Sequence, residues 1–556
     1  MDVVYNHTNA SGQAEKSVLD RIVPGYYHRL NADGQVEKST CCENTATEHR
    51  MMEKLMVDSV VTWATAYKVD GFRFDLMGHH MLENMVHVRA ALDALTPAAD
   101  GVDGPAIYLY GEGWNFGEVA NNARGRNATQ LNIGGTGIGV FNDRLRDAAR
   151  GGNPFGDPRE QGFLTGLFTA PSDFPQGGPD AQRARLLEYM DWIRVGLAGN
   201  LRDYRLQNRN GETVAGAQVL YNGAPAGYTL DPQENIVYVS AHDNETLFDA
   251  VQWKMPLSAT LSDRVRAHNL GVSLVMLAQG VPFFHAGDDL LRSKSLDRNS
   301  YNSGDWFNKL DFTYQTNNWA VGLPPEGSDR WDLMRPLLAD PALRAAPGDI
   351  EAARRHFREM LALRRSSPLF RMRTADDIIR RLTFLNTGPD QVPGLIVLDL
   401  TDTEGDDLDP NYERLVALFN ANPEPVTFGD DGLRGLALEL HPVQQASADA
   451  LVTTAAFDAA TGAFTVPGRT AAVFVLRQAE PEPTAAPPTA TAPAATATLV
   501  PPTATRVPPT ATPQPAPTST PVPAAPASAP APSPWALVLA FAGALLVVYL
   551  AARRQV

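Results

Sequence analysis

The sequence has few cysteines and no excess of positive charge. Only two cysteines occur among 556 residues, and they are adjacent, at Cys41 and Cys42. A fold that depends on a framework of several disulfides is therefore excluded. We expect two buried free thiols, with a vicinal disulfide as the alternative for a chain outside the cell. The formal net charge of -16 argues against a nucleic-acid partner, because phosphate binding needs a basic surface.

A recognisable export signal is also lacking. Residues 1–20 contain no apolar core of the kind that a secretory signal peptide requires. Residues 1–7 instead look like the middle of a strand and the loop that follows it. Two interpretations stay open: export relies on another segment of the chain, or the sequence starts inside a longer protein.

The far end of the chain has a composition of its own. Residues 479–534 consist mainly of Pro, Ala, Thr and Ser, with near-repeats of the type PTAT. Such a segment buries too little apolar surface to offset its chain entropy, so we predict a disordered, extended linker. Residues 535–552 are uncharged and rich in Leu, Val and Ala. At about 1.5 Å per residue they form a helix of roughly 27 Å, which predicts a transmembrane helix.

Two arginines follow this apolar segment directly. Arg553 and Arg554 favour the cytoplasmic side of a membrane. The sequence therefore predicts a short cytoplasmic tail at residues 553–556. It places everything before the transmembrane helix on the extracellular face, anchored to the cell membrane.

Short apolar runs alternate with helical spacing over residues 1–367. We predict strands at residues 69–75, 106–112, 235–240 and 281–285, and helices at residues 48–67, 81–95 and 263–279. This alternation predicts parallel βα units, as in a catalytic (β/α) barrel. Residues 368–478 change to short strands, such as those at 395–398 and 471–476, which indicate a separate C-terminal β-sandwich domain.

Polar side chains follow the predicted strands where each strand ends. Asp75, Glu112 and the pair His242–Asp243 occupy such positions, which is where a (β/α) barrel builds its active site. Arg73 and Asp75 lie two apart on a strand and point to the same face. A guanidinium there keeps a carboxylate ionised, as a nucleophile requires. A buried ion pair that only closes the barrel is the alternative.

The other two carboxylates have surroundings suited to sugar chemistry. Glu112 is followed at Trp114 by an indole that can stack on a sugar and raise the pKa of the acid. A raised pKa is what a general acid needs near neutral pH. Asp243 lies among polar groups at residues 240–246 that can grip hydroxyls. The alternative for Glu112 is an ordinary loop residue, and the alternative for Asp243 is a helix N-cap.

Four ordered motifs carry a resemblance to a known family. The segments 2–7 (DVVYNH), 71–75 (GFRFD), 111–114 (GEGW) and 242–244 (HDN) look like the four signatures of the α-amylase superfamily. The segments 75–80, 135–143, 290–295 and 299–307 are similar to those of bacterial pullulanases. The likeness runs from residue 1 to about 478, including the β-rich part.

This resemblance implies a glycoside hydrolase, a pullulanase-type retaining endo-glycosidase that cuts α-1,6 branch linkages in pullulan, starch-derived dextrins and related α-glucans. It implies Asp75 as nucleophile, Glu112 as acid/base and Asp243 as the third carboxylate, which stabilises the transition state. For a retaining enzyme we expect the carboxyl groups of Asp75 and Glu112 about 5–5.5 Å apart. The implied sugar site is lined by His7, Arg73, His80, Trp114, Asp143, His242, Asn244 and Asn299. Some relatives have Asp at the position of Asn299, which leaves the outer-subsite preference open.

The resemblance also bears on how many of the barrel strands this sequence contains. In the family the first signature marks the end of the third barrel strand, so it implies an N-terminally truncated (β/α)8 TIM barrel without its first strands. We expect such a chain not to form an active enzyme alone. The chemistry needs no cofactor; a structural calcium ion is typical of the superfamily, at a position that the sequence leaves undefined. An isoamylase-like or dual α-1,4/α-1,6 hydrolase and a non-hydrolytic cell-surface glucan-binding protein are the alternatives.

Overall fold

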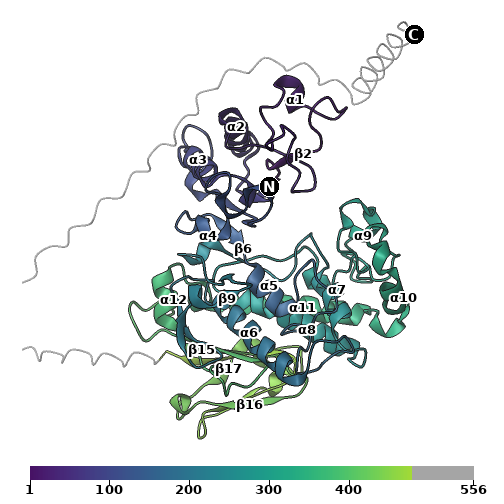
Figure 1. Cartoon of the computed structure of the whole chain (residues 1–556). Coiled ribbons are helices and arrows are strands. Elements are labelled where there is room, and N and C mark those ends of the chain that lie inside the picture. The colour runs from purple at the N-terminus through teal and green to yellow at the C-terminus, as the bar shows by residue number, and fades with distance from the viewer. Residues whose placement is uncertain (479–556) are drawn as a thin grey trace, which may run out of the picture. The chain divides into compact units, whose positions relative to one another are not determined.

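A parallel sheet of six strands, of which β6 is labelled in Figure 1, is formed by strands between residues 2 and 282. The computed structural model describes residues 1–478, and all that follows refers to them. The strands lie in the order β1 (Asp2–Val3), β4 (Gly71–Phe74), β5 (Tyr108–Gly111), β6 (Gly139–Phe141), β11 (Asn235–Val237) and β12 (Val281–Pro282).

The two outer strands are the edges of this sheet. Within the described residues β1 pairs only with β4, with Asp2 opposite Arg73, and β12 pairs only with β11. A closed (β/α)8 barrel needs eight strands, so this sheet is open between β12 and β1. The architecture is that of an α/β protein whose parallel sheet is consistent with part of a TIM barrel.

The strands and helices predicted from apolar periodicity are present. The four predicted strands are β4, β5, β11 and β12, and the three predicted helices are α2 (Arg50–Tyr67), α3 (Leu82–Asp93) and α8 (Leu261–Leu277). In α2, Met52, Met56, Val60 and Ala64 recur every four residues and are fully buried, which fixes one face against the sheet. The helix ends where Lys68 adopts a left-handed φ of 58°.

Other helices pack around these elements. The longer ones are α5 (Asp143–Arg150), α6 (Pro179–Leu197), α7 (Leu247–Lys254), α10 (Trp331–Ala339) and α11 (Pro347–Ser366). The shorter ones are α1 (Leu19–Ile22), α4 (Gln130–Ile133), α9 (Asp305–Asn308), α12 (Ala375–Arg381) and α13 (Pro442–Gln445). Three small antiparallel pairs lie in the connections: β2 (His7–Thr8) with β3 (Glu43–Asn44), β7 (Arg205–Gln207) with β8 (Thr213–Ala215), and β9 (Leu220–Tyr221) with β10 (Ala224–Pro225).

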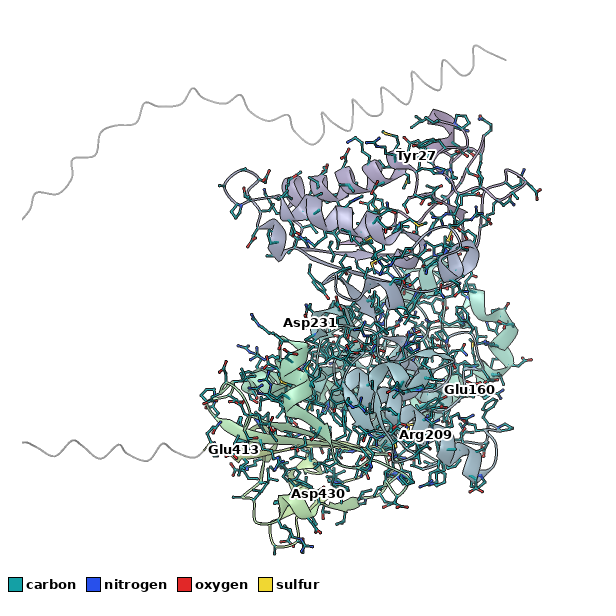
Figure 2. All side chains as sticks on the ribbon, turned by 60° about the vertical axis from the view of Figure 1, so that its left-hand side comes forward. Tyr27, Glu160, Arg209, Asp231, Glu413 and Asp430 are labelled. Atoms are coloured by element: carbon teal, nitrogen blue, oxygen red, sulfur yellow. A yellow bond between two sulfur atoms is a disulfide. The ribbon has the colours of Figure 1, made fainter. Side chains whose placement is uncertain are left out.

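The C-terminal part is rich in antiparallel strands, as predicted, and also contains the short helices α12 and α13. Its antiparallel five-stranded sheet has the order β13 (Leu382–Phe384), β14 (Leu395–Thr401), β15 (Tyr412–Asn420), β20 (Thr470–Arg477) and β17 (Glu439–Leu440). A second sheet comprises β16 (Val426–Gly429), β19 (Ala463–Val466) and β18 (Ala456–Asp458). Val397, Leu418 and Phe474 of the first sheet pack against Phe464 of the second. In Figure 2, Glu413 and Asp430 mark this part and lie far from Tyr27.

The β-rich part shares an apolar core with the preceding helices. The opposite face of its large sheet, including Leu398, Ala417 and Val473, belongs to one apolar cluster with Met190 of α6 and Leu274 of α8. Because alternate residues of a strand face opposite ways, β14, β15 and β20 are buried on both faces. Both parts accordingly fall within one compact unit. The predicted boundary after residue 367 stays a prediction.

The predicted linker (479–534), transmembrane helix (535–552) and cytoplasmic tail (553–556) lie outside the described residues. Among residues 1–478, none of the helices combines the length and the apolar character that crossing a membrane requires.

The expectation of two buried free thiols is wrong. Cys41 and Cys42 are joined by a vicinal disulfide; Cys41 is exposed and Cys42 is half-buried. The pair directly precedes β3, in a connection at the surface rather than in the core, which sequence periodicity did not reveal.

Candidate active site

The predicted functional residues gather at the carboxyl end of the parallel sheet. Asp75 directly follows β4, and Glu112 directly follows β5. His242 and Asp243 lie in the connection that leaves β11 toward α7. The carboxyl ends of parallel strands share one edge of a sheet, so residues distant in the sequence meet there.

Arg73 of β4 joins the carboxylates of Asp75 and Glu112. Its Nη1 lies 3.0 Å from Oδ1 of Asp75 and 2.9 Å from Oδ1 of Asp2, and its Nη2 lies 3.0 Å from Oε1 of Glu112. Burial disfavours the charged guanidinium, but Glu112, Asp2 and Asp75 outweigh burial and raise the pKa of Arg73. The predicted pairing of Arg73 with Asp75 is confirmed. One guanidinium therefore keeps both carboxylates close together.

Glu112 lies where a carboxyl group holds its proton more tightly than in water. Its side chain is 11% exposed. Burial raises the pKa of Glu112; Arg73 opposes this, while Asp75 and Asp243 add to it. The backbone N–H of Leu76 donates to Oε2 of Glu112 at 2.9 Å. Burial together with neighbouring carboxylates thus produces the raised pKa that a general acid needs.

A strained turn positions the loop after Asp75. Leu76 adopts φ 39° and ψ 48°, a left-handed conformation that is uncommon for a residue other than glycine. The turn aims the Leu76 N–H at Glu112. Gly78 follows, and a Cβ there would lie 2.2 Å from the backbone oxygen of Trp114. The loops after β4 and β5 therefore touch each other backbone to backbone.

Asp75 is also held from the N-terminal side. Nδ2 of Asn6 donates to Oδ2 of Asp75 at 3.1 Å, and the side chain of Asp75 is 20% exposed. The neighbouring His7 is half-buried, and burial lowers the pKa of His7 although Asp75 opposes that shift. Asp75 thus combines two hydrogen-bond donors with access to solvent.

Asp243 has the opposite surroundings. Its side chain is 65% exposed, and Nε2 of His242 lies 3.6 Å from Oδ1 of Asp243. The N-cap of α7 is Thr246, whose hydroxyl accepts from the N–H of Asp249. The alternative reading of Asp243 as a helix cap is therefore wrong, and its carboxylate is free to face a ligand.

A cleft of about 1250 Å³ opens over this end of the sheet. Eight predicted site residues line it: Arg73, Glu112, Trp114, Asp143, His242, Asp243, Asn244 and Asn299. Asp75 and His7 do not line this cleft. Asp75 contacts Arg73, which does line it, and Asn6, which directly precedes His7. A cavity of this size accommodates several sugar rings rather than one small molecule.

His80 lies elsewhere than predicted. It is fully buried, with Nδ1 3.3 Å from the hydroxyl of Thr47, and burial lowers the pKa of His80 to about 3. The short 3₁₀ helix η1 (Met77–His79) turns the chain between Asp75 and His80, so His80 enters the core. Its spacing from Asp75 could not reveal this turn.

Two arginines of α5 were missed by sequence reasoning. Arg144 contacts Asp143, and the guanidinium of Arg146 lies 5.9 Å from the Trp114 ring centroid and 5.5 Å from that of Tyr238. Both arginines line the cleft. Burial raises the pKa of Asp143, but Arg144 and Arg146 outweigh burial and lower it. The sequence could have indicated these arginines, since they lie one and three residues after the predicted site residue Asp143.

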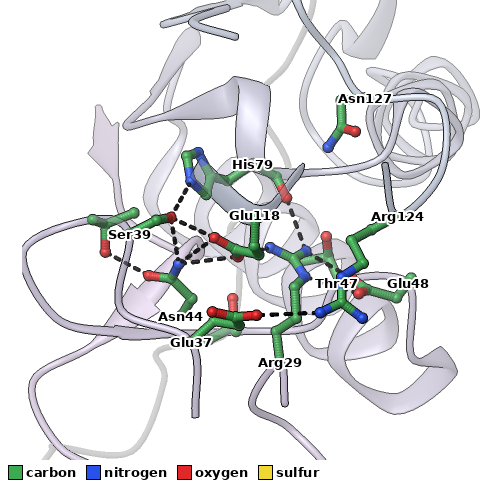
Figure 3. A network of polar contacts seen from close by, with 12 residues as sticks. Arg29, Glu37, Ser39, Asn44, Thr47, Glu48, His79, Glu118, Arg124 and Asn127 are labelled. Atoms are coloured by element: carbon green, nitrogen blue, oxygen red, sulfur yellow. Dashed lines mark hydrogen bonds and ion pairs between the residues drawn. The ribbon is translucent and has the colours of Figure 1, made fainter. Parts of the chain in front are cut away.

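A buried polar network fixes the loops beside Asp75 (Figure 3). Arg29 donates to both oxygens of Glu48, at 2.8 and 2.7 Å, and to Glu118 at 2.8 Å. Glu118 also accepts from Asn44 at 3.0 Å and from Ser39. Although burial opposes it, these hydrogen bonds lower the pKa of Glu118 to about 2.

The network extends to the site on two sides. Asn44 of β3 lies opposite His7 of β2 in the antiparallel register. Arg29 donates from Nη2 to the backbone oxygen of His79 at 3.0 Å, four residues after Asp75. The network therefore ties the strand that carries His7 to the loop that carries Asp75.

The structural calcium ion expected from the resemblance stays a prediction, and the one group of metal-ligating side chains found among the described residues is of another kind. In residues 1–478, the group of three or more His, Cys, Asp or Glu side chains close enough to share an ion is His7, Cys41 and Cys42. Calcium takes six to eight oxygen ligands, which nitrogen and sulfur atoms do not supply. The donor set therefore does not fit calcium.

Comparison with known proteins identifies relatives along most of the described chain. Residues 314–477 match the family of alpha-1,6-glucosidases, pullulanase-type, C-terminal. The chain is 51% identical over 484 residues to Pullulanase 1, chloroplastic, of Arabidopsis thaliana, covering 85% of this chain and 50% of that protein. It is 41% identical over 497 residues to the pullulanase of Klebsiella pneumoniae, covering 88% and 44%.

A solved structure agrees with these relatives. The crystal structure of the maltotriose complex of PulA from Klebsiella pneumoniae superposes with a TM-score of 0.80 at 41% identity, covering 86% of this chain and 51% of that one. The chain thus spans about half the length of the relatives that it matches.

Proposed function

Because the chain belongs by sequence to the pullulanase-type α-1,6-glucosidases, we propose that it hydrolyses α-1,6-glucosidic branch linkages in pullulan, starch-derived dextrins and related α-glucans. The observation that carries this proposal is the Arg73 guanidinium, which contacts Asp75 and Glu112 at 3.0 Å each beside a cleft wide enough for a glucan. Retaining glycosidases use two carboxyl groups about 5–5.5 Å apart, and a shared guanidinium suits that separation.

Glu112 acts first, as the acid. Because the pKa of Glu112 is raised, a larger fraction of this group carries a proton near neutral pH than of an ordinary glutamic acid. It gives that proton to the glycosidic oxygen as the bond to the anomeric carbon breaks, and the chain beyond the branch leaves with a neutral hydroxyl.

Asp75 attacks the anomeric carbon from the opposite face of the sugar. Arg73 and Asn6 hold its two oxygens and favour the ionised form that a nucleophile needs. The covalent glycosyl–enzyme then reacts with water, from which Glu112 now takes a proton. The starting state of both carboxyl groups returns, with the anomeric configuration retained.

The remaining residues bind and stabilise. Asp243 holds sugar hydroxyls and stabilises the positive charge that develops on the ring. Trp114, kept in place by Arg146, offers a face for stacking. The other cleft residues, together with His7, complete the sugar site: Arg73, Asp143, His242, Asn244 and Asn299.

A non-hydrolytic glucan-binding protein is the second candidate. The exposed side chains of His242 and Asp243, which line the cleft, favour it, because accessible polar groups can hold sugar hydroxyls without any bond breaking. Both candidates require the cleft, but only the first requires Glu112 to release and take up a proton.

Incubating the chain, cut after residue 478, with pullulan separates these functions. Release of maltotriose supports endo-α-1,6 hydrolysis and contradicts the expectation that the chain is inactive alone, and panose indicates cleavage of α-1,4 linkages. Retention on a pullulan affinity gel without any product, lost in Asp75→Ala, supports glucan binding. Neither product nor retention would overturn both proposals for this chain.

The location is a proposal that rests on composition. The apolar segment 535–552, followed by Arg553 and Arg554, supports anchoring to the cell membrane with the site on the extracellular face. The chemistry above uses protein groups alone, so we propose that no cofactor takes part. Fractionation of cells that express the full chain tests the anchor: removal of residues 535–556 moves an anchored protein into the soluble fraction.

A further inference from the structure

Three metal-ligating atoms lie together beside Asp75. Nε2 of His7 lies 3.5 Å from Sγ of Cys41, and these atoms and Sγ of Cys42 are all within 4.8 Å of one another. Cys41 is exposed and the other two residues are half-buried, so ions and small reagents reach them from solvent. Within the described residues this is the one group of three or more His, Cys, Asp or Glu side chains whose ligand atoms lie close enough to share a metal ion.

We propose that reduction of the Cys41–Cys42 disulfide creates a site for one thiophilic divalent cation, such as Zn²⁺ or Cd²⁺, with His7 as the third ligand. A tetrahedral zinc ion has Zn–S and Zn–N bonds of about 2.3 and 2.0 Å, which set sulfur and nitrogen about 3.5 Å apart. The separation between Cys41 and His7 already has that value. Two thiolates and one imidazole leave the fourth position to water, and soft sulfur ligands favour such cations.

The ligands keep their places without the disulfide. The bonded residues are neighbours in the sequence, so the disulfide closes almost no chain loop and constrains the unfolded chain little. Thr40 donates to Oδ1 of Asn44 at 2.5 Å, and Nδ2 of Asn44 donates to Glu118 at 3.0 Å. Because Asn44 lies opposite His7, these contacts hold the cysteine turn against the strand that carries His7.

The redox step is balanced by an external phosphine and water. The phosphine takes up an oxygen atom from water and becomes a phosphine oxide. Its two electrons and the two protons of that water convert the disulfide into two thiols. Cation binding then releases the two thiol protons, because the thiolate is the ligand.

The site has a consequence for hydrolysis, which rests on the proposed function. Asn6, which donates to Oδ2 of Asp75, directly precedes His7. A cation on His7 removes this imidazole from the sugar site and adds positive charge near the nucleophile. We expect Zn²⁺ to inhibit the reduced chain and to leave the disulfide form unaffected.

Cadmium titration of the full chain tests the site without any activity measurement. The chain has only these two cysteines, so every thiolate-to-cadmium charge-transfer band reports on them. We expect the phosphine-reduced chain to bind one Cd²⁺ with such a band, displaced by Zn²⁺, and the disulfide form to show none. Absence of the band in a reduced chain that keeps its native circular dichroism overturns the proposal.

Variants distinguish a three-ligand site from a bare dithiol. Cys42→Ser removes one of the two thiolates, so the band weakens and Cd²⁺ affinity falls. His7→Gln keeps the band but weakens Cd²⁺ affinity at least about tenfold, as expected for loss of a ligand. His87→Gln, an exposed histidine on α3, is the matched control and keeps the wild-type affinity. Equal affinity of wild type and His7→Gln overturns the assignment of His7, whether or not the chain hydrolyses pullulan.

Discussion

The two sides of the cleft differ in how far their carboxylates are fixed before a ligand arrives. On the β4–β5 side, Asp75 and Glu112 share Arg73 and are 20% and 11% exposed. On the β11 side, Asp243 is 65% exposed and contacts His242 at 3.6 Å. Fixed, buried charges need little reorganisation during a reaction, whereas an exposed side chain adapts to what it binds. The first side suits bond breaking and the second suits holding a flexible glucan.

Removing the proton donor tests the fixed side most severely. Glu112→Gln cannot protonate a leaving group, so we expect kcat on pullulan to fall about 10²–10⁴-fold. The alkaline limb of the pH–rate profile should vanish with it, because that limb reports deprotonation of Glu112. Initial rates of sugar release against pH measure both effects. Glu351→Gln, on α11, where Glu351 pairs with Arg354 and Arg355 and does not line the cleft, is the control; a Glu112→Gln enzyme near the wild-type rate would assign the acid elsewhere.

Removing the shared cation tests what holds the fixed side together. Arg73→Met leaves Asp2, Asp75 and Glu112 without their partner, and breaking a buried ion pair costs about 3–5 kcal/mol of unfolding free energy. Urea denaturation of the two proteins measures the difference. Arg355→Met, on the exposed surface of α11, should leave the urea midpoint unchanged. Equal midpoints for Arg73→Met and wild type would show that the carboxylates do not depend on Arg73.

The exposed side should respond in rate and not in stability. Asp243→Asn removes a charge that faces the cleft, and we expect kcat to fall about 10²–10³-fold, as for other transition-state contacts. The free energy of unfolding should change by less than about 0.5 kcal/mol, because surface substitutions seldom do more. Kinetics and urea denaturation of the same preparation give both values. A large loss of stability would mean that Asp243 is structural.

The smallest expected effect is the pH dependence of stability from Glu112. Its pKa is raised in the folded chain, so the folded state favours the protonated form. This contribution is complete below the ordinary glutamate pKa of about 4.3 and is lost as pH rises through the raised value. The difference in unfolding free energy between wild type and Glu112→Gln should therefore change across that window. A constant difference would contradict the raised pKa.

Local rules predicted the elements and part of the site. Apolar runs located β4, β5, β11 and β12, and the two-residue spacing of Arg73 and Asp75 predicted their contact, because strand geometry alone decides it. Asp75 and Glu112 directly follow neighbouring parallel strands, which the alternation of strands and helices also indicated.

What the sequence left undetermined depends on contacts between distant segments. Arg29 meets Glu118 across 89 residues, and no local pattern links them. His80 was misplaced because η1 turns the chain after Asp75. The burial of Cys41 and Cys42 was misjudged because cysteine is usually a core residue, whereas this turn before β3 lies at the surface.

Because the sheet of β14, β15 and β20 is buried on both faces, it limits which parts of this chain can be exchanged with those of a relative. Successive residues of a strand face opposite ways. Leu398 packs in the cluster that includes α6 and α8, whereas Val397 packs in the cluster that includes β16 and β19. In a chimaera joined after residue 367 to the β-rich part of a relative, the interface between the two sheets would come from one protein. The interface with α6 and α8 would combine residues of two proteins. Successful grafts must carry α6 and α8 along, so the portable module is larger than the sandwich itself.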